Sequence, residues 1–198
     1  MATSLQTPTT VPQATGEAAA VIKPNKRLYL IPLIVLGLFA VTYLIAWLNA
    51  YQLTGRFLAD ANARYEQGEY LEALVGGEEF DPETSKYTKV GGYVDVEKIW
   101  SNPYSFPVPG AVELARERIQ ETISQYMTIA QAERYIQSNI GKPAPYFGEI
   151  YLRLGELYEQ EGDLLAARDI YESIPELFPN RADLLELAEA HLQRLGDS

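Results

Sequence analysis

The chain has 198 residues, a formal net charge of −11 and no cysteine. This length allows one domain of ordinary size with appendages, and the lack of cysteine excludes disulfides, thiolate catalysis, iron–sulfur clusters and covalently attached haem. The charge is unevenly placed, because residues 51–198 hold 13 basic and 26 acidic residues. So acidic a region repels phosphate backbones, and the sequence therefore argues against nucleic-acid binding.

Residues 28–50 form an uncharged, apolar run of 23 residues. At about 1.5 Å per residue the run gives a helix of roughly 35 Å, enough to cross a hydrocarbon core of about 30 Å. Tyr29 marks one boundary of the run, and Tyr43, Trp47 and Tyr51 gather near the other, as aromatic residues do at membrane interfaces. A buried core helix is the alternative, which the lack of any polar face disfavours. We expect a transmembrane helix whose side chains contact membrane lipid.

The basic residues around this run set its expected orientation. They cluster before it, at Lys23, Lys26 and Arg27. By the positive-inside rule, the low-complexity tail of residues 1–27 is cytoplasmic, and residues 51–198 are periplasmic or extracellular. A cleaved signal peptide is the rival interpretation, but the run is too long and no small-x-small cleavage site follows it. The sequence therefore predicts an uncleaved anchor in a bacterial cytoplasmic membrane.

Beyond the run, residues 52–74 continue the helical pattern, with Gly68 as an interruption. Residues 76–110 hold five glycines and four prolines, which predicts an irregular loop insertion. The second half of the insertion is too aromatic for disorder, and its rings are Tyr93, Trp100, Tyr104 and Phe106. These rings either fold back onto the helices or dock on a partner protein, since Trp and Tyr are frequent interface anchors. We take them as candidate partner contacts.

Residues 111–139 return to a helical pattern, with apolar residues every three or four positions. The segment forms either one long helix or two helices joined near Thr128. Gly141 and the prolines at 143 and 145 end it.

Internal repetition decides the expected fold of the last third of the chain. Residues 148–181 carry a small-residue and tyrosine pattern of 34 residues, made by Tyr151, Leu154, Gly155, Tyr158, Gly162, Ala167, Tyr171 and Pro179. This pattern resembles the tetratricopeptide-repeat family. The resemblance implies two antiparallel helices that approach closely at Gly155 and Ala167, turn at Gly162 and end at Pro179. The tyrosines and Leu154 would fill the seam between the helices.

Other segments repeat this pattern less completely. One departure within the repeat is Pro175, which predicts a kinked or shortened second helix. Residues 182–195 read as a capping helix, and residues 57–73 and 114–147 as degenerate repeats. The expected fold class is all-α, with one transmembrane helix followed by a short tetratricopeptide-like α-hairpin array. Such a short array is marginally stable alone, so we expect a partner to stabilise it.

The sequence contains no pattern typical of a catalytic, cofactor or metal site. His191 is the chain's one histidine, and a solvated or partly packed role is expected for it. The acidic groups at residues 78–83 and 156–163 lack the spacing of a calcium loop, so we interpret them as solvated faces. The serines have no histidine to activate them, and no glycine-rich phosphate cradle is present. We expect a protein that is not an enzyme and holds no cofactor.

These features together favour a non-catalytic structural accessory subunit of a large membrane protein complex. We expect the host to be a respiratory or photosynthetic electron-transfer complex, in which the chain braces or docks extrinsic subunits. Its partners would be other membrane and extrinsic protein subunits, with no nucleic acid. The alternative is a transient assembly factor or envelope scaffold that holds client proteins in the repeat groove. The fold supports partner binding without naming the partner.

Overall fold

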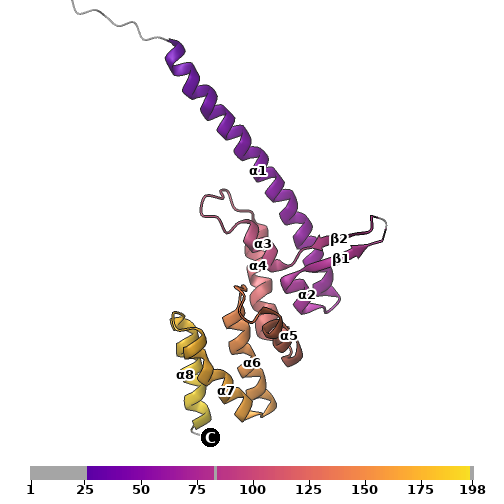
Figure 1. The fold of residues 1–198 in the computed structure, drawn as a ribbon, viewed down its shortest axis with the longest axis vertical. Coiled ribbons are helices and arrows are strands. Elements are labelled where there is room, and N and C mark those ends of the chain that lie inside the picture. Colours follow the sequence, from indigo (N-terminus) through magenta and orange to yellow (C-terminus); the bar gives the residue numbers. More distant parts are fainter. Residues whose placement is uncertain (1–25, 83, 197–198) are drawn as a thin grey trace, which may run out of the picture. The chain divides into compact units, whose positions relative to one another are not determined.

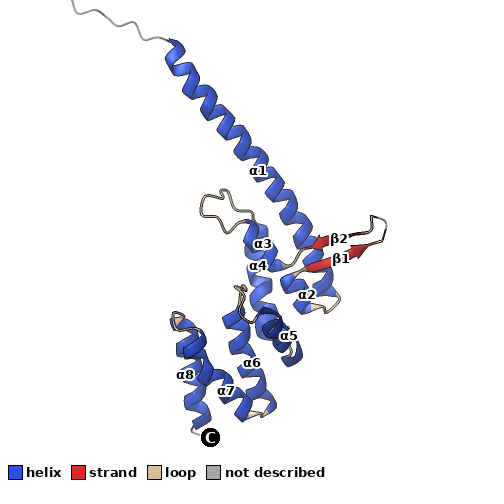
Figure 2. Cartoon of the chain, in the orientation of Figure 1, coloured by secondary structure: helices blue, strands red, loops and turns tan. Residues whose placement is uncertain are grey.

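The computed structural model describes residues 26–82 and 84–196. The described residues form eight α-helices, a short π-helical segment and one two-stranded sheet (Figures 1 and 2). The mostly helical fold is confirmed, whereas the sheet corrects the expectation of an all-α chain. Residues 1–25, which hold most of the tail expected in the cytoplasm, lie outside the described residues.

The chain divides into two units, residues 1–43 and residues 44–198. Helix α1 runs from Lys26 to Glu66 without interruption, so the expected membrane helix and the first exterior helix are one element. It contains one stretch long and apolar enough to cross a membrane, and none of that stretch is buried inside the protein. This bears out the apolar helix expected at residues 28–50.

The remaining elements belong to the unit that begins at residue 44. The helices in chain order are α2 (Tyr70–Val75), α3 (Tyr93–Ile99), α4 (Gly110–Glu121), the π-helical segment η1 (Thr122–Tyr126), α5 (Ile129–Asn139), α6 (Phe147–Glu161), α7 (Leu164–Leu177) and α8 (Ala182–Gly196). Gly68 separates α1 from α2 with a left-handed φ of 79°. Between η1 and α5 the chain breaks at Thr128, so residues 111–139 form separate helices and not one long helix.

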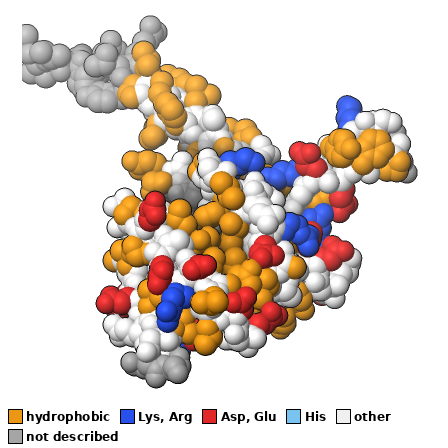
Figure 3. Space-filling model, turned by 60° about the horizontal axis from the view of Figure 1, so that its bottom comes forward, with side chains coloured by type: hydrophobic (Ala, Val, Ile, Leu, Met, Phe, Trp, Pro, Cys, Tyr) orange, Lys and Arg blue, Asp and Glu red, His pale blue; other side chains and the backbone are white. Residues whose placement is uncertain are grey.

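The expectation of an irregular insertion at residues 76–110 is wrong. Strands β1 (Gly77–Asp81) and β2 (Lys86–Val90) pair as an antiparallel hairpin, and α3 follows directly. Phe80 lies opposite Tyr87, and their rings meet edge to face at 5.4 Å between centroids, a contact that stabilises paired strands. The hairpin projects on the right of Figure 3, with hydrophobic side chains near its end. The longest irregular stretch among the described residues of this region is 100–109, between α3 and α4.

The last three turns of α1 belong to the core of the second unit. Phe57 is 6% exposed and Ala61 is fully buried, and both pack in one cluster with residues of α2 to α6. Gly91 lies so close to the Phe57 ring that a Cβ there would be 2.3 Å from the ring. Burial of a large apolar side chain contributes about 1.5–3 kcal/mol, so this part of α1 stabilises the unit and does not merely lead into it.

Helices α5 to α8 pack in succession, each against the next in the chain (Figure 1). Gly162, at a left-handed φ of 85°, makes the turn between α6 and α7, and the Asp163 carboxylate caps α7 by accepting from Ala166 N at 3.1 Å. Pro175 does not end α7, which continues to Leu177. Packing of successive helices is common to many helical folds, so the tetratricopeptide-like character of this region stays a prediction.

Candidate partner-binding groove

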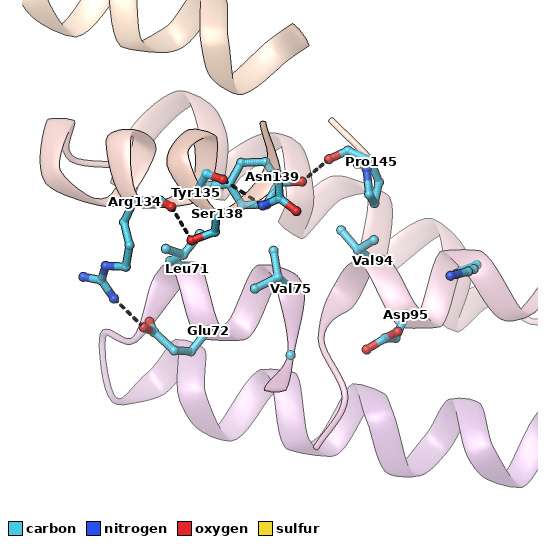
Figure 4. A pocket seen from close by; sticks show the side chains of 12 residues that line it. Leu71, Glu72, Val75, Val94, Asp95, Arg134, Tyr135, Ser138, Asn139 and Pro145 are labelled. Carbon is cyan, nitrogen blue, oxygen red and sulfur yellow. Dashed lines mark hydrogen bonds and ion pairs between the residues drawn. The ribbon is translucent and has the colours of Figure 1, made fainter. Parts of the chain in front are cut away.

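A groove with a volume of about 420 Å³ lies between α2, α3 and α5 (Figure 4). It is the main candidate site. Its floor is apolar and is made by Leu71 and Val75 of α2 and Val94 of α3. Polar and charged side chains stand along its walls: Glu72, Asp95, Lys98, Arg134, Ser138 and Asn139. A groove of this volume lies in the lower part of the range that is typical of ligand sites.

Two glycines allow α2 and α3 to approach closely enough to form this floor. Gly76 ends α2 at a left-handed φ of 71°, and a Cβ at this position would lie 2.6 Å from Val90 O. Gly92 precedes α3, and its Cβ would lie 2.2 Å from Gly76 N. Any larger residue at either position would force the two helices apart, because the neighbouring atoms belong to the backbone.

Helix α5 supplies the opposite wall and begins at a full capping box. Thr128 Oγ1 accepts a hydrogen bond from Gln131 N at 3.3 Å, and Gln131 Oε1 accepts one from Thr128 N at 3.1 Å. Further along the helix, the buried Tyr135 donates its hydroxyl proton to the Pro145 carbonyl. Burial, with a smaller effect from the Glu149 charge, raises the pKa of Tyr135 to about 12, so this hydroxyl stays protonated at physiological pH.

Ion pairs stand at two places around the floor. Arg134 Nη1 of α5 lies 3.0 Å from Glu72 Oε1 of α2 and so bridges two walls. Lys89 Nζ lies 2.6 Å from Asp95 Oδ1, while Asp95 Oδ2 accepts from Gly92 N at 3.3 Å. Each of these two carboxylates at the groove is therefore paired with a basic side chain.

A second polar cluster lies between α6, α7 and α8. It agrees with the partly packed role expected for His191 and corrects the expectation of a solvated face for Glu156 and Glu159. His191 Nδ1 lies 2.7 Å from Glu159 Oε2, and Tyr171 donates its hydroxyl to the same oxygen at 3.0 Å. The Tyr171 ring stacks on the imidazole with 4.6 Å between centroids. The His191 side chain is 13% exposed, and Glu156 and Glu159 face it, so these glutamates are not a solvated face.

Burial alone would raise the pKa of the Glu159 carboxyl. Hydrogen bonds from His191 and Tyr171, and the nearby charge of Arg194, outweigh burial and hold this pKa below its ordinary value. Burial and the hydrogen bond to Glu159 raise the pKa of Tyr171. The cluster joins three helices by a partly buried hydrogen-bond network.

The residues of the repeat pattern meet at the α6–α7 contact. Leu154, Ala167 and Tyr171 are buried, and a Cβ on Gly155 would lie 2.6 Å from Tyr171 Cε1. The Tyr151 hydroxyl shares a hydrogen bond with Ser173 Oγ at 2.8 Å, also across this seam. Of the three remaining members, Gly162 and Pro179 lie in the turn after α6 and in the turn after α7.

Tyr158 differs from this expectation in part. Its hydroxyl donates to Glu133 of α5, so its polar end joins α6 to α5 and does not face α7. That hydrogen bond, assisted by burial, raises the pKa of Tyr158 to about 12. The residue therefore extends the packing of successive helices back to α5.

The four candidate partner contacts separate into two pairs. Tyr93 is fully buried and Trp100 is 6% exposed, so both belong to the core. Tyr104 and Phe106, in the loop between α3 and α4, are 84% and 77% exposed. Of the four rings, only those of Tyr104 and Phe106 are therefore exposed enough to contact a partner.

The residues of the groove form no recognisable motif in the sequence. They come from three elements that are far apart in the chain, and the interrupted helical pattern around Gly76 and Gly92 was their one local signal. Among the described residues, no three His, Cys, Asp or Glu side chains are arranged to hold a metal ion. No family model, curated protein or solved structure matches the chain.

Proposed function

We propose that this protein is a non-catalytic structural accessory subunit of a large membrane protein complex. The observation that carries the proposal is the groove between α2, α3 and α5, which has an apolar floor and charged walls. It occurs together with the one helix among the described residues that is long and apolar enough to cross a membrane. In this proposal α1 anchors the chain in a bacterial cytoplasmic membrane with the tail inside. The groove then holds a segment of a partner subunit on the other side.

The groove defines the chemistry of that segment. It should present a small apolar side chain to Leu71, Val75 and Val94, and polar groups to Arg134 and Asp95 at the rim. Apolar anchors in a pocket with a polar rim are typical of protein interfaces. As host we propose a respiratory or photosynthetic electron-transfer complex, because such assemblies include single-span subunits that carry no cofactor.

The test is purification of the native complex in mild detergent, with the chain counted against the chains that co-migrate with it. We expect stoichiometric amounts in the mature complex. A chain absent from the mature complex contradicts the proposal, and a chain found only with incomplete assemblies identifies a transient assembly factor instead.

A matched pair of variants tests the groove itself. Ser138→Phe places a ring in the groove, whereas Gln137→Phe adds the same ring at the neighbouring exposed position, which does not line the groove. We expect Ser138→Phe to weaken association on the order of tenfold, the effect of about 1.4 kcal/mol, and Gln137→Phe to leave it unchanged. Equal association of the two variants would show that the partner binds elsewhere.

A further inference from the structure

The loop between α3 and α4 differs in composition from the acidic domain around it. No charged residue occurs between Lys98 and Glu113. Within this stretch three apolar side chains are exposed, Tyr104 at 84%, Phe106 at 77% and Val108 at 49%. An uncharged loop that exposes two aromatic rings and a valine is an exposed apolar patch of the kind that marks protein or membrane contact sites.

Hydrogen bonds and ring contacts hold this loop beside α1. Trp47 Nε1 donates to the Pro107 carbonyl at 2.9 Å, and the Trp47 and Trp100 rings meet edge to face at 5.9 Å. Trp100 Nε1 in turn donates to the buried Thr54 Oγ1 at 2.6 Å. The loop is thus fixed at the level of residues 47–54 of α1.

That level coincides with the end of the apolar stretch of α1. Counting from Leu30, a hydrocarbon core of about 30 Å takes about 20 residues of helix, which ends close to Trp47. The first charged residue after this point is Arg56, about 13 Å further along the helix. Trp47 and Tyr51, stacked at 5.3 Å, are the kind of aromatic pair that marks the headgroup region.

We propose that the loop of residues 101–109 inserts into the outer headgroup region of the bilayer, with Tyr104, Phe106 and Val108 as its membrane contacts. This inference rests on the part of the proposed function in which α1 crosses the membrane. The ligand is the lipid surface itself, and it makes the loop a second membrane contact beside the helix.

The backbone of the loop is suited to this depth. Prolines at 103, 107 and 109 have no N–H group to desolvate. Two of the other N–H groups are bonded within the loop, because Ser105 N donates to Asn102 O and Tyr104 N donates to Asn102 Oδ1, both at 2.9 Å. Irregular backbone is excluded from the hydrocarbon core but is compatible with the hydrated headgroup region.

The β1–β2 hairpin supplies an internal comparison. It also exposes two rings, Phe80 at 54% and Tyr87 at 70%. Its contacts with α1 lie beyond Arg56, at Phe57, whose ring centroid is 5.4 Å from Lys89 Nζ, and at Arg64, which lies 2.7 Å from Glu79. Arg64 is about 25 Å further along the helix than Trp47, beyond the headgroup region. Exposed rings on the hairpin are therefore expected to remain in water.

The experiment uses spin labels on the full chain, which has no cysteine of its own. Single cysteines replace Val108 in the loop, Leu36 in the apolar stretch and Leu165 at the start of α7, and the labelled chains are reconstituted into phosphatidylcholine vesicles. Collisions with oxygen, which concentrates in lipid, are compared with collisions with a water-soluble nickel chelate. We expect the Val108 label to favour oxygen, as Leu36 does, and the Leu165 label to favour nickel.

A matched pair of double substitutions tests whether the two rings hold the loop in the bilayer. In the Val108→Cys chain, Tyr104→Ser with Phe106→Ser should raise nickel access to the label several-fold. Phe80→Ser with Tyr87→Ser should leave nickel access at the loop unchanged.

Two results would overturn the inference in different ways. A Val108 label as open to nickel as Leu165, with Leu36 shielded, rejects the loop insertion alone and leaves a partner protein as the neighbour of the rings. A Leu36 label that is also open to nickel rejects the membrane anchor of the proposed function together with the loop insertion.

Discussion

At the residue scale, Glu159 makes the stability of the helical domain depend on pH. Its pKa is lower in the folded chain than the ordinary 4.5, so the unfolded chain binds its proton first as the pH falls. The resulting stabilisation is fully present above pH 4.5, the ordinary pKa. It is lost as the pH falls from 4.5 through the lower pKa that Glu159 has in the folded chain. We expect urea denaturation followed by circular dichroism to show a free energy of unfolding that declines in this range.

Glu159→Gln should flatten that decline while lowering stability at neutral pH, because the amide keeps the shape but loses the charge. Glu186, exposed on α8, is the control position, and Glu186→Gln should leave the decline in place. Identical pH profiles for the native chain and Glu159→Gln would contradict the assignment.

The pairing of His191 with Glu159 could not be predicted from the sequence, because the two residues are 32 positions apart. Sequence separation alone places Glu189, not Glu159, near the histidine, and the real partners come from α6 and α7. Burial of Tyr93 was similarly hidden, because a tyrosine in a glycine-rich segment reads equally well as core or as surface. Its hydroxyl proton goes to Asn62 Oδ1 of α1, a contact between residues 31 positions apart.

At the scale of elements, the approach of α6 to α7 depends on Gly155. A Cβ there would lie 2.6 Å from Tyr171 Cε1 and 3.0 Å from Ile170 Cγ2, and the fully buried Tyr171 ring has little room to move. We expect Gly155→Ala to lower the free energy of unfolding by about 1–3 kcal/mol, the usual cost of overpacking. Chemical denaturation in detergent measures this change.

The matched control is Gly55→Ala, inside α1. Nothing lies within 4 Å of a Cβ at this position, so the methyl group meets open space. Alanine is favoured over glycine in a helix interior by about 0.5–1 kcal/mol, and this variant should be neutral or slightly more stable. If both substitutions stabilise the chain equally, the close contact at Gly155 is not limiting.

Elements with strong helical periodicity were predictable, and the hairpin was not. Helices α6, α7 and α8 follow the expected boundaries closely, since apolar spacing, Gly162 and Asp163 all agree. Strand β1 reads Gly-Glu-Glu-Phe-Asp, in which only Phe80 favours a strand, and it is stabilised by pairing with β2. Both the pairing of β1 with β2 and the groove lined by three separate elements depend on contacts between distant parts of the chain. Local sequence patterns do not predict such contacts.

At the scale of the whole molecule, α1 serves both units, and this gives a prediction about truncation. A chain that begins at Leu44 keeps Phe57 and Ala61, which pack in the core of the second unit. A chain that begins at Gln67 lacks both. We expect the first to melt cooperatively and the second to lose cooperative melting, because replacing one buried Phe by Ala already costs about 3–5 kcal/mol.

Thermal unfolding followed by near-ultraviolet circular dichroism distinguishes these outcomes. A cooperative transition in the chain that begins at Gln67 would show that α1 is only a leader to an independent domain.

Trp47 and Trp100 are the two tryptophans of the chain, and they touch each other where α1 meets the α3–α4 loop. Indole absorbs at longer wavelengths than phenol, so selectively excited intrinsic fluorescence arises from this one joint. The protein thus carries a native optical reporter whose emission responds to the polarity and packing at that position. Replacing either tryptophan with phenylalanine leaves a single emitter, with which arrival of a partner or a change of lipid can be followed without any label.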